Sequence, residues 1–211
     1  MTFVRELRRR LFARFYDRVQ ASYDARMAPR KEALFADLSG TVVEIGPGTG
    51  ANLPHLPRDV RWIGIEPNPH MHTRLRQRAT TMGIDAEFRL ASAQGLEFDD
   101  ASVEVVLGTL VLCSVPDPAA VLAEVRRVLR PGGRFIFIEH VAAPRGTLLW
   151  RTQRLVCPLW SLMADGCRPD RELGTALRAA GFSSLELEEF HVVRHSPLDV
   201  VAPHVAGVAC K

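Results

Sequence analysis

A β-forming run near residue 45 ends in a glycine-rich loop, and few folds accommodate that combination. Residues 41–45 (TVVEI) read as a strand that stops at Gly46, Gly48 and Gly50, after which residues 51–53 begin a short helix. Only glycine lets a backbone approach a ligand so closely, so a strand, glycine loop and helix in this order are typical of nucleotide-binding folds. The loop predicts an α/β protein with a ligand at the end of its first strand.

Strand-like and helix-like segments alternate along the rest of the chain. After the loop, strands are expected at 61–66, 86–90, 103–108 and 134–140, helices at 69–82 and 117–129, and a turn at 130–133. The last part adds helices around 147–163 and 170–180 and strand-like stretches at 184–193 and 201–210. Such alternation implies a parallel sheet, and the last two stretches fit an antiparallel pair. We therefore predict an α/β, Rossmann-like fold with a seven-stranded mixed sheet and helices on both faces.

The first 38 residues precede this alternation. Apolar residues recur at helical spacing over residues 3–19, with arginines on much of the remaining surface, and a second helical pattern covers residues 24–38. Two roles stay open for these helices. They could form a lid over the ligand site, adding Tyr16 or Tyr23 to it, or attach weakly to an anionic membrane surface through residues 1–19. We favour the lid and expect residues 39–211 to form one compact domain.

Composition and charge narrow the range of partners. The net charge of +3 gives no indication of nucleic-acid binding. The four cysteines stand far apart, with no Cys-x-x-Cys pair and no histidine at ligand spacing, so the sequence predicts reduced thiols and no metal site. No apolar run reaches the roughly 18–20 residues of a membrane-spanning helix, and the charged N-terminus does not resemble a secretory signal. We therefore expect a cytoplasmic protein.

Two classes of cofactor use a glycine loop of this kind. A NAD-binding protein needs G-x-G-x-x-G or G-x-G-x-x-A, and Ala51 satisfies the second form. An acidic residue at the end of the next strand, here Glu66, would accept hydrogen bonds from ribose hydroxyls in either class. The glycines and Glu66 alone therefore leave a NAD(P)-dependent oxidoreductase open.

Three segments resemble the motifs of class I methyltransferases, which use S-adenosylmethionine (SAM). Residues 43–50 (VEIGPGTG) resemble motif I, in which an acid stands two positions before the first glycine. Residues 65–71 (IEPNPHM) resemble motif II, where the acid holds the ribose and the following residues wall the adenine. Residues 129–134 (LRPGGR) resemble the turn that precedes the fifth strand in this class. The combination favours SAM over NAD.

This resemblance implies SAM as cofactor, S-adenosylhomocysteine as product, and a set of binding residues. Ser92 stands where many relatives carry an aspartate that accepts a hydrogen bond from the adenine amino group. A neutral hydroxyl is a weaker acceptor, so the adenine is expected to be bound partly by the backbone of Ala93 and Gln94. Thr109 matches the residue whose carbonyl receives the SAM ammonium. The residues expected to bind the cofactor are Glu44, Gly46, Pro47, Gly48, Gly50, Asn52, Glu66, Pro67, Asn68, Met71, Ser92, Ala93, Gln94 and Thr109.

Four further segments narrow the resemblance to one group. Residues 109–115 (TLVLCSV), 139–143 (EHVAA), 165–167 (DGC) and 203–207 (PHVAG) resemble the methyltransferase-like seven group, the alkyl thiol methyltransferases, and its bacterial relatives. The likeness covers nearly all of the chain from residue 30 onward. It implies methyl transfer to a small-molecule acceptor, with a thiol as first choice. The alternatives are an oxygen or nitrogen atom of a secondary metabolite, a lipid headgroup, and SAM binding without turnover.

Two residues are candidates for a catalytic role. His140 stands at the carboxyl end of the fifth strand, where open α/β sheets bind ligands. It is expected either to act as a base or orient the acceptor, or to be held by hydrogen bonds beneath the pocket. Asp165 is a second acid or base candidate, although Asp-Gly is also an ordinary turn. Cys113 is interpreted as a small pocket or core residue, because methyl transfer has no covalent enzyme step.

Overall fold

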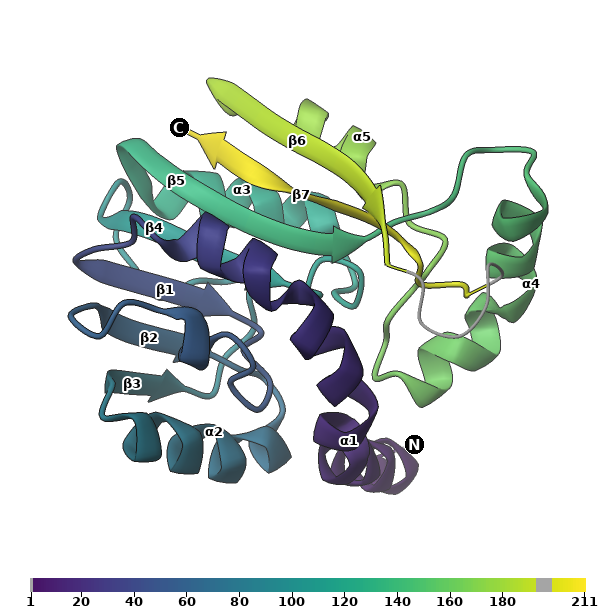
Figure 1. Cartoon of the computed structure of the whole chain (residues 1–211), viewed down its shortest axis with the longest axis horizontal. Coiled ribbons are helices and arrows are strands. Elements are labelled where there is room, and N and C mark those ends of the chain that lie inside the picture. Colours follow the sequence, from purple (N-terminus) through teal and green to yellow (C-terminus); the bar gives the residue numbers. More distant parts are fainter. Residues whose placement is uncertain (1, 193–198) are drawn as a thin grey trace.

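The computed structural model describes residues 2–192 and 199–211, and its centre is a seven-stranded sheet (Figure 1). The strand order is β3-β2-β1-β4-β5-β7-β6. The strands are β1 (Thr41–Ile45), β2 (Arg61–Ile65), β3 (Asp85–Arg89), β4 (Val103–Thr109), β5 (Leu129–His140), β6 (Ser184–His191) and β7 (Pro203–Cys210). β7 runs antiparallel to both β5 and β6, whereas β1 to β5 pair in parallel. The predicted Rossmann-like mixed sheet is confirmed.

Helices pack on both faces of this sheet. The end of α1 and the apolar side of α2 bury Phe35 and Leu75 against Val42 of β1, while α3 and α5 pack on the opposite face. Alternate residues of a strand point to opposite faces, so Val42 and Val43 enter the two separate cores. The helices are α1 (Thr2–Phe35), the short η1 (Leu53–His55), α2 (Pro69–Met82), α3 (Pro118–Val128), α4 (Leu148–Met163) and α5 (Leu173–Ala179).

Local signals explain why α2 begins and ends where it does. The side chain of Asn68 accepts a hydrogen bond from the backbone N–H of His70 at 3.1 Å, and Pro69 occupies the first helical position. Gly83 ends the helix with a φ of +66°, a conformation that costs glycine little. The Asn68 cap fixes the end of the loop between β2 and α2, and Gly83 turns the chain toward β3.

The N-terminal segment differs from the prediction of two helices. Residues 2–35 form one continuous helix, α1, which includes Pro29. No glycine separates the two predicted halves. Tyr23, inside the expected break, and Met27, beyond it, are buried against Ile138 and Ala206 of the sheet. Tertiary packing therefore holds the segment helical where the sequence pattern changes phase.

Two other boundaries also differ from the prediction. The expected turn at residues 130–133 lies inside β5, where Val103 pairs with Leu129 and Val105 pairs with Arg134, so the intervening residues bulge from the strand. Residues 170–172 precede α5 rather than belonging to it, because the carbonyl of Arg171 accepts a hydrogen bond from the N–H of Ala142. Both differences come from pairing with distant segments.

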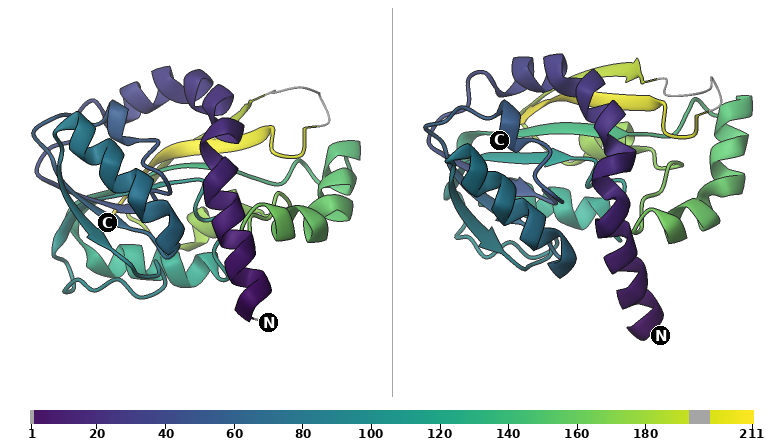
Figure 2. Two further views of the ribbon diagram at one scale, coloured as in Figure 1. Left: turned by 90° about the horizontal axis from the view of Figure 1, so that it is seen from below. Right: turned by 60° about the horizontal axis from the view of Figure 1, so that its bottom comes forward.

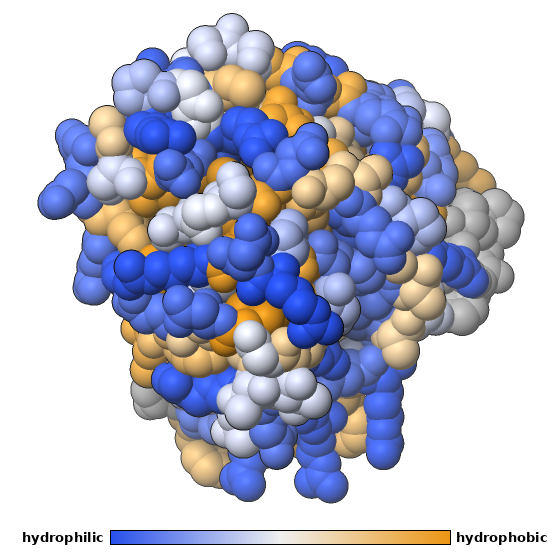
Figure 3. Space-filling view, turned by 60° about the vertical axis from the view of Figure 1, so that its left-hand side comes forward, coloured by the Kyte–Doolittle hydropathy of each residue, from blue (hydrophilic) through white to orange (hydrophobic). Residues whose placement is uncertain are grey.

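α1 crosses the carboxyl edge of the sheet and its first turns project from the body, as both views of Figure 2 show. On the face shown in Figure 3, hydrophilic and apolar side chains are interspersed. Among the described residues, no helix combines the length and apolarity needed to span a membrane.

Candidate functional site

The glycine loop lies at the carboxyl end of β1 with a bare backbone. Gly46 and Gly48 have φ values of +61° and +57°, which favour glycine. A Cβ on Gly46 would lie 2.5 Å from Cγ2 of Val111, and a Cβ on Gly48 would lie 3.6 Å from Cε1 of Tyr16 on α1. At Gly46 the Val111 side chain already occupies that space, so glycine is required there for packing, whereas the bare backbone at Gly48 leaves room for a ligand between the loop and Tyr16.

Glu66 joins the glycine loop to the start of α2. Its carboxylate accepts hydrogen bonds from the backbone N–H of Gly48 at 2.9 Å and of Asn68 at 2.7 Å. Burial raises the pKa of Glu66 to about 7, against the lowering effect of these two hydrogen bonds. The acid predicted to bind ribose therefore stands beside the bare loop and changes charge near neutral pH.

Glu44 lies behind the loop and orients Asn52. Its two carboxylate oxygens accept hydrogen bonds from Asn52 Nδ2 and Trp62 Nε1, each at 2.8 Å, and burial raises its pKa to about 7. Asn52 Nδ2 also donates to Thr109 Oγ1 at 2.8 Å. The Oδ1 atom of Asn52 is buried and has no hydrogen-bond partner among the described residues. Buried polar atoms are almost always paired, so this acceptor is suited to an ammonium or hydroxyl group of a ligand.

Four other residues of the predicted cofactor set complete this edge. Within the glycine loop, the N–H of Gly50 donates to the carbonyl of Pro47 at 2.8 Å and closes a tight turn. Met71 is buried in the first turn of α2, and the carbonyl of Pro67 accepts a hydrogen bond from a side chain of α1. The structure thus gathers the residues of motifs I and II at one place.

The segment after β3 stands apart from these contacts. Ser92 Oγ accepts a hydrogen bond from the backbone N–H of Gln94 at 3.3 Å, and both side chains are exposed. Ala93 between them is buried. The predicted adenine contact of this segment stays a prediction.

α1 covers the edge that carries the glycine loop. Thr49 Oγ1 donates to Asp17 at 2.5 Å, and Arg74 of α2 donates to the carbonyl of Ala13 at 2.6 Å while forming an ion pair with Asp17 at 3.4 Å. Asn68 Nδ2 lies 3.4 Å from the carbonyl of Arg9. These contacts tie three successive turns of α1 to both ligand-binding loops.

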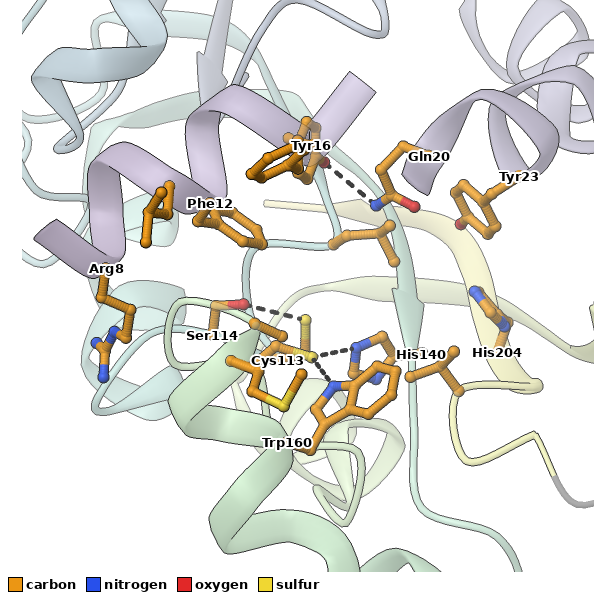
Figure 4. A pocket seen from close by; sticks show the side chains of 17 residues that line it. Arg8, Phe12, Tyr16, Gln20, Tyr23, Cys113, Ser114, His140, Trp160 and His204 are labelled. Carbon is orange, nitrogen blue, oxygen red and sulfur yellow. Dashed lines mark hydrogen bonds between the residues drawn. The ribbon is translucent and has the colours of Figure 1, made fainter. Parts of the chain in front are cut away.

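A cavity of about 600 Å³ lies beneath α1 (Figure 4). Its walls come from α1, the turn after β4, the end of β5, α4 with the loop after it, and β7 with the segment before it, and they are mostly apolar. Tyr16 connects the cavity with the glycine loop, because it lines this α1 cavity and also faces Gly48. No carboxylate or lysine lines the cavity within the part of the chain that the structure describes. The cavity therefore suits a small apolar molecule.

Two cysteines and a histidine meet at the floor of the α1 cavity. His140 Nε2 lies 2.9 Å from Cys167 Sγ, and Trp160 Nε1 donates to the same sulfur at 3.1 Å (Figure 4). Cys113 also contacts Cys167 through its thiol. The ligand atoms of Cys113, His140 and Cys167 all lie within 4.8 Å of one another, and all three residues are buried. We call this group the Cys-His-Cys cluster.

The two cysteines of the cluster differ in acidity. A hydrogen bond from Cys113 lowers the pKa of Cys167 to about 4, against the effect of burial, and His140 and Trp160 add to the lowering. Burial raises the pKa of Cys113 well above its usual range. These contacts therefore favour ionisation at Cys167 over ionisation at Cys113.

The sequence predictions did not bring this cluster together. They considered the cysteines by their spacing along the chain, and 54 positions separate Cys113 from Cys167. A usable signal was present, because the segments at 109–115, 139–143 and 165–167 that carry the family resemblance each supply one member. The predicted role of His140 as base or orienting residue stays a prediction.

Glu139 is a second residue that sequence reasoning did not single out. Its buried carboxylate accepts hydrogen bonds from the backbone N–H groups of Val111 and Leu112, each at 2.8 Å, and of Cys113 at 3.2 Å. The turn begins with Leu110 at a φ of +56°, a conformation that non-glycine residues rarely adopt. Glu139 therefore holds the turn that presents Cys113 to the cavity.

Asp165, the second predicted catalytic residue, lies outside the lining of the α1 cavity. Asn68 Nδ2 lies 3.3 Å from its carboxylate, and the guanidinium of Arg8 lies 3.7 Å from it. These neighbours place Asp165 between α1 and the motif II loop. A role in the reaction remains a prediction, because its carboxylate contacts Asn68 of the motif II loop and also Arg8, which lines the α1 cavity.

Comparison with known proteins identifies the family. Residues 43–137 match the model of the methyltransferase domain family. The chain is 39% identical to human thiol S-methyltransferase TMT1A over 95% of its own length and 86% of that protein, and 38% identical to human thiol S-methyltransferase TMT1B over 88% and 80%. The chain belongs to the thiol S-methyltransferase family. This methyltransferase accordingly transfers methyl groups to a small-molecule acceptor, and the family and fold are those of SAM-dependent enzymes.

Solved structures support the fold of this methyltransferase. A SAM-dependent methyltransferase of Thermotoga maritima is 25% identical, with a TM-score of 0.64 over 95% of this chain and 98% of its own. The cyclase SpnF is 20% identical, with a TM-score of 0.68 over 88% and 80%. The second likeness shows the fold alone, because one fold serves unrelated reactions.

Proposed function

We propose that this methyltransferase moves the methyl group of SAM to the sulfur of a small apolar thiol. The observation that carries the proposal is the position of the α1 cavity, which Tyr16 joins to the bare backbone at Gly48. An acceptor in the cavity would lie beside a cofactor held at the glycine loop. The names of the human relatives, thiol S-methyltransferases, support sulfur as the methylated atom.

The residues at the carboxyl edge fit SAM. Asn52 Oδ1 is a buried acceptor without a partner among the described residues, and it can receive the ammonium of the methionine end. Glu66 can accept hydrogen bonds from the ribose hydroxyls. The bare backbone at Gly48 leaves room for the part of SAM that links its ammonium to its ribose. When bound, SAM supplies a methyl group already activated by its sulfonium.

The residues of the cavity perform the remaining tasks. Its mostly apolar walls exclude water and confine the acceptor near the cofactor, which removes much of the entropic cost of the encounter. A thiol has a pKa of about 8.5 and needs little help to become a thiolate, whereas an alcohol would need a strong base. The lining described for the cavity offers no carboxylate or lysine, and its titratable bases are His140 and His204. An imidazole is a weak base that suits a thiol better than an alcohol, so the lining favours the thiol.

A panel assay tests the acceptor. The purified chain is incubated with methyl-labelled SAM and a mixture of small aliphatic thiols, phenols and amines, and the products are identified by mass spectrometry. We expect labelled thioethers, with turnover rising as the thiol becomes more apolar. Labelled ethers or methylamines in place of thioethers would contradict the thiol assignment.

We further propose that α1 acts as a lid over SAM, and Arg74→Ala tests this. The substitution removes the hydrogen bond to Ala13 and the ion pair with Asp17, both half-exposed, so stability should change by under about 1 kcal/mol. Because α1 is then held less firmly over the cofactor site, KM for SAM should rise several-fold. Arg126→Ala, an exposed arginine on α3, is the matched control and should leave KM unchanged.

The rival role for α1 makes a different prediction. If residues 1–19 serve attachment to an anionic membrane surface, Arg74→Ala should leave KM for SAM as it was, and the chain should sediment with anionic vesicles at low salt. That pair of results would overturn the lid.

A further inference from the structure

We propose that Cys113, His140 and Cys167 bind a zinc ion that holds the acceptor's sulfur. This inference rests on the proposed thiol methylation. The three residues come from the turn after β4, the end of β5 and the loop after α4. Their ligand atoms lie within 4.8 Å of one another, and all three residues are buried. Two sulfurs and one imidazole nitrogen are a common zinc ligand set, and three protein ligands leave one position open.

The three ligand atoms of the cluster lie near enough to one another to share one metal ion. Zinc bonds of roughly 2.3 Å to sulfur and 2.1 Å to nitrogen separate such ligands by roughly 3.5 Å. His140 Nε2 and Cys167 Sγ lie 2.9 Å apart, so small side-chain rotations would make room for the ion. Trp160 Nε1 donates to Cys167 Sγ at 3.1 Å, and a hydrogen bond of this kind orients a ligand sulfur and moderates its charge.

The charge and surroundings of the cluster also fit a divalent cation. Two thiolates and a neutral imidazole would cancel the charge of Zn²⁺ and leave a neutral site in the apolar floor of the cavity. All three residues line the α1 cavity, so an ion that they held would border the cavity's occupant. A thiol that enters the cavity would complete the tetrahedron as the fourth ligand.

Such a site would supply the thiolate that the proposed reaction needs. A thiol loses its proton when it binds zinc, and that proton passes to solvent. The sulfur then forms a bond to the methyl carbon as the bond between that carbon and the sulfonium sulfur breaks. The products are two neutral thioethers and the zinc, and a thioether is a weak ligand that leaves readily.

Cobalt titration tests the metal site. Co²⁺ is added to the reduced full-length chain, and the visible bands of tetrahedral cobalt and the thiolate charge-transfer band are followed. We expect one equivalent to bind, with affinity about a hundredfold or more lower in Cys113→Ala and Cys167→Ala. Cys157→Ala is the matched control, because Cys157 is buried on α4 but bonds to Asp170 away from the cluster. Adding a small thiol should shift the spectrum of the cobalt form.

A second measurement keeps the test independent of how the variants fold. Alkylation of the unaltered chain with iodoacetamide, mapped by mass spectrometry, should be slowed by Zn²⁺ at Cys113 and Cys167 and unaffected at Cys210. Equal cobalt binding by the parent and the Cys167→Ala variant would overturn the inference. So would a chain that binds no cobalt, including one in which Cys113 and Cys167 form a disulfide.

The outcomes separate this inference from the proposed function. Labelled thioethers from a chain that binds no metal would overturn the zinc site and leave thiol methylation standing. Zinc binding without any methylated thiol would uphold the metal site and overturn the proposed acceptor.

Discussion

The Glu66→Gln variant is expected to bind SAM about a hundredfold more weakly than the parent chain at pH 8. The buried carboxylate can accept from the ribose hydroxyls while it accepts from Gly48 and Asn68. Hydrogen bonds to a charged group contribute about 1.5–3 kcal/mol each, and glutamine keeps only one uncharged acceptor oxygen. A net loss near 2.7 kcal/mol corresponds to about a hundredfold in Kd. Calorimetry with SAM measures it.

The same residue gives SAM binding a pH dependence. The pKa of Glu66 is raised to about 7, mainly by burial, and hydroxyl donors favour its ionised form, so binding releases a proton. Affinity should therefore rise with pH and level off above pH 7. At pH 6 about one carboxyl in eleven is ionised, so Kd should be roughly tenfold higher than at pH 8.

The variant supplies the control for this dependence. Glu66→Gln should show a much smaller change in Kd between pH 6 and pH 8 than the parent chain, once the ionisation of SAM itself, which both proteins share, is subtracted. The change that remains is assigned to Glu44, which orients Asn52 and whose pKa is also raised to about 7. Glu97→Gln, at an exposed position after β3, should behave as the parent chain. An unchanged Kd in Glu66→Gln would show that the acid does not contact the cofactor.

Replacing Glu139 by Leu is expected to destabilise the fold by about 3–5 kcal/mol. The carboxylate accepts from three backbone N–H groups of the turn that presents Cys113, and leucine leaves all three without an acceptor. Each buried N–H left unpaired costs about 1–3 kcal/mol, and leucine removes the penalty of burying a carboxylate. For a chain of this size the midpoint of thermal unfolding should fall by about 10 °C.

A leucine at an exposed strand position provides the comparison. Glu186→Leu on β6 should move the midpoint by no more than about 2 °C, because that side chain is exposed. Scanning calorimetry distinguishes the two variants. A Glu139→Leu protein as stable as Glu186→Leu would show that the turn at Val111 holds its conformation without the carboxylate.

Local patterns were enough to place most of the sheet and the cofactor edge. The strands β1, β2, β3 and β4 occur within a residue or two of the predicted ranges. β1, β2 and β4 are short, largely apolar runs bounded by turn residues, whereas β3 (DAEFR) alternates polar and apolar residues. The glycine loop at Gly46 and Gly48 and the acid at Glu66 were predicted in the same way, because each stands at the end of a predicted strand. They lie at the ends of adjacent parallel strands, and that topology brings them together.

The family resemblance implied a thiol acceptor but did not show where it would sit. The segments that carry the resemblance are far apart in the sequence, and nothing in their spacing indicates that Cys113, His140 and Cys167 meet. Their meeting depends on the turn held by Glu139 and on the loop after α4. Both are tertiary arrangements.

The sequence by itself determined the alternating architecture and the bare loop at the end of β1, since periodicity, caps and glycines act between near neighbours. Only the tertiary structure decided that α1 is one helix, that residues 130–133 bulge within β5, and that an apolar cavity with a Cys-His-Cys floor lies beneath α1. Gly132 and Gly133 pair with Lys211 at the other end of the chain, and α1 is anchored to α2 and the sheet. Contacts between residues so distant in the sequence produce no local pattern from which they could be predicted, because they stabilise the protein only once the chain has folded.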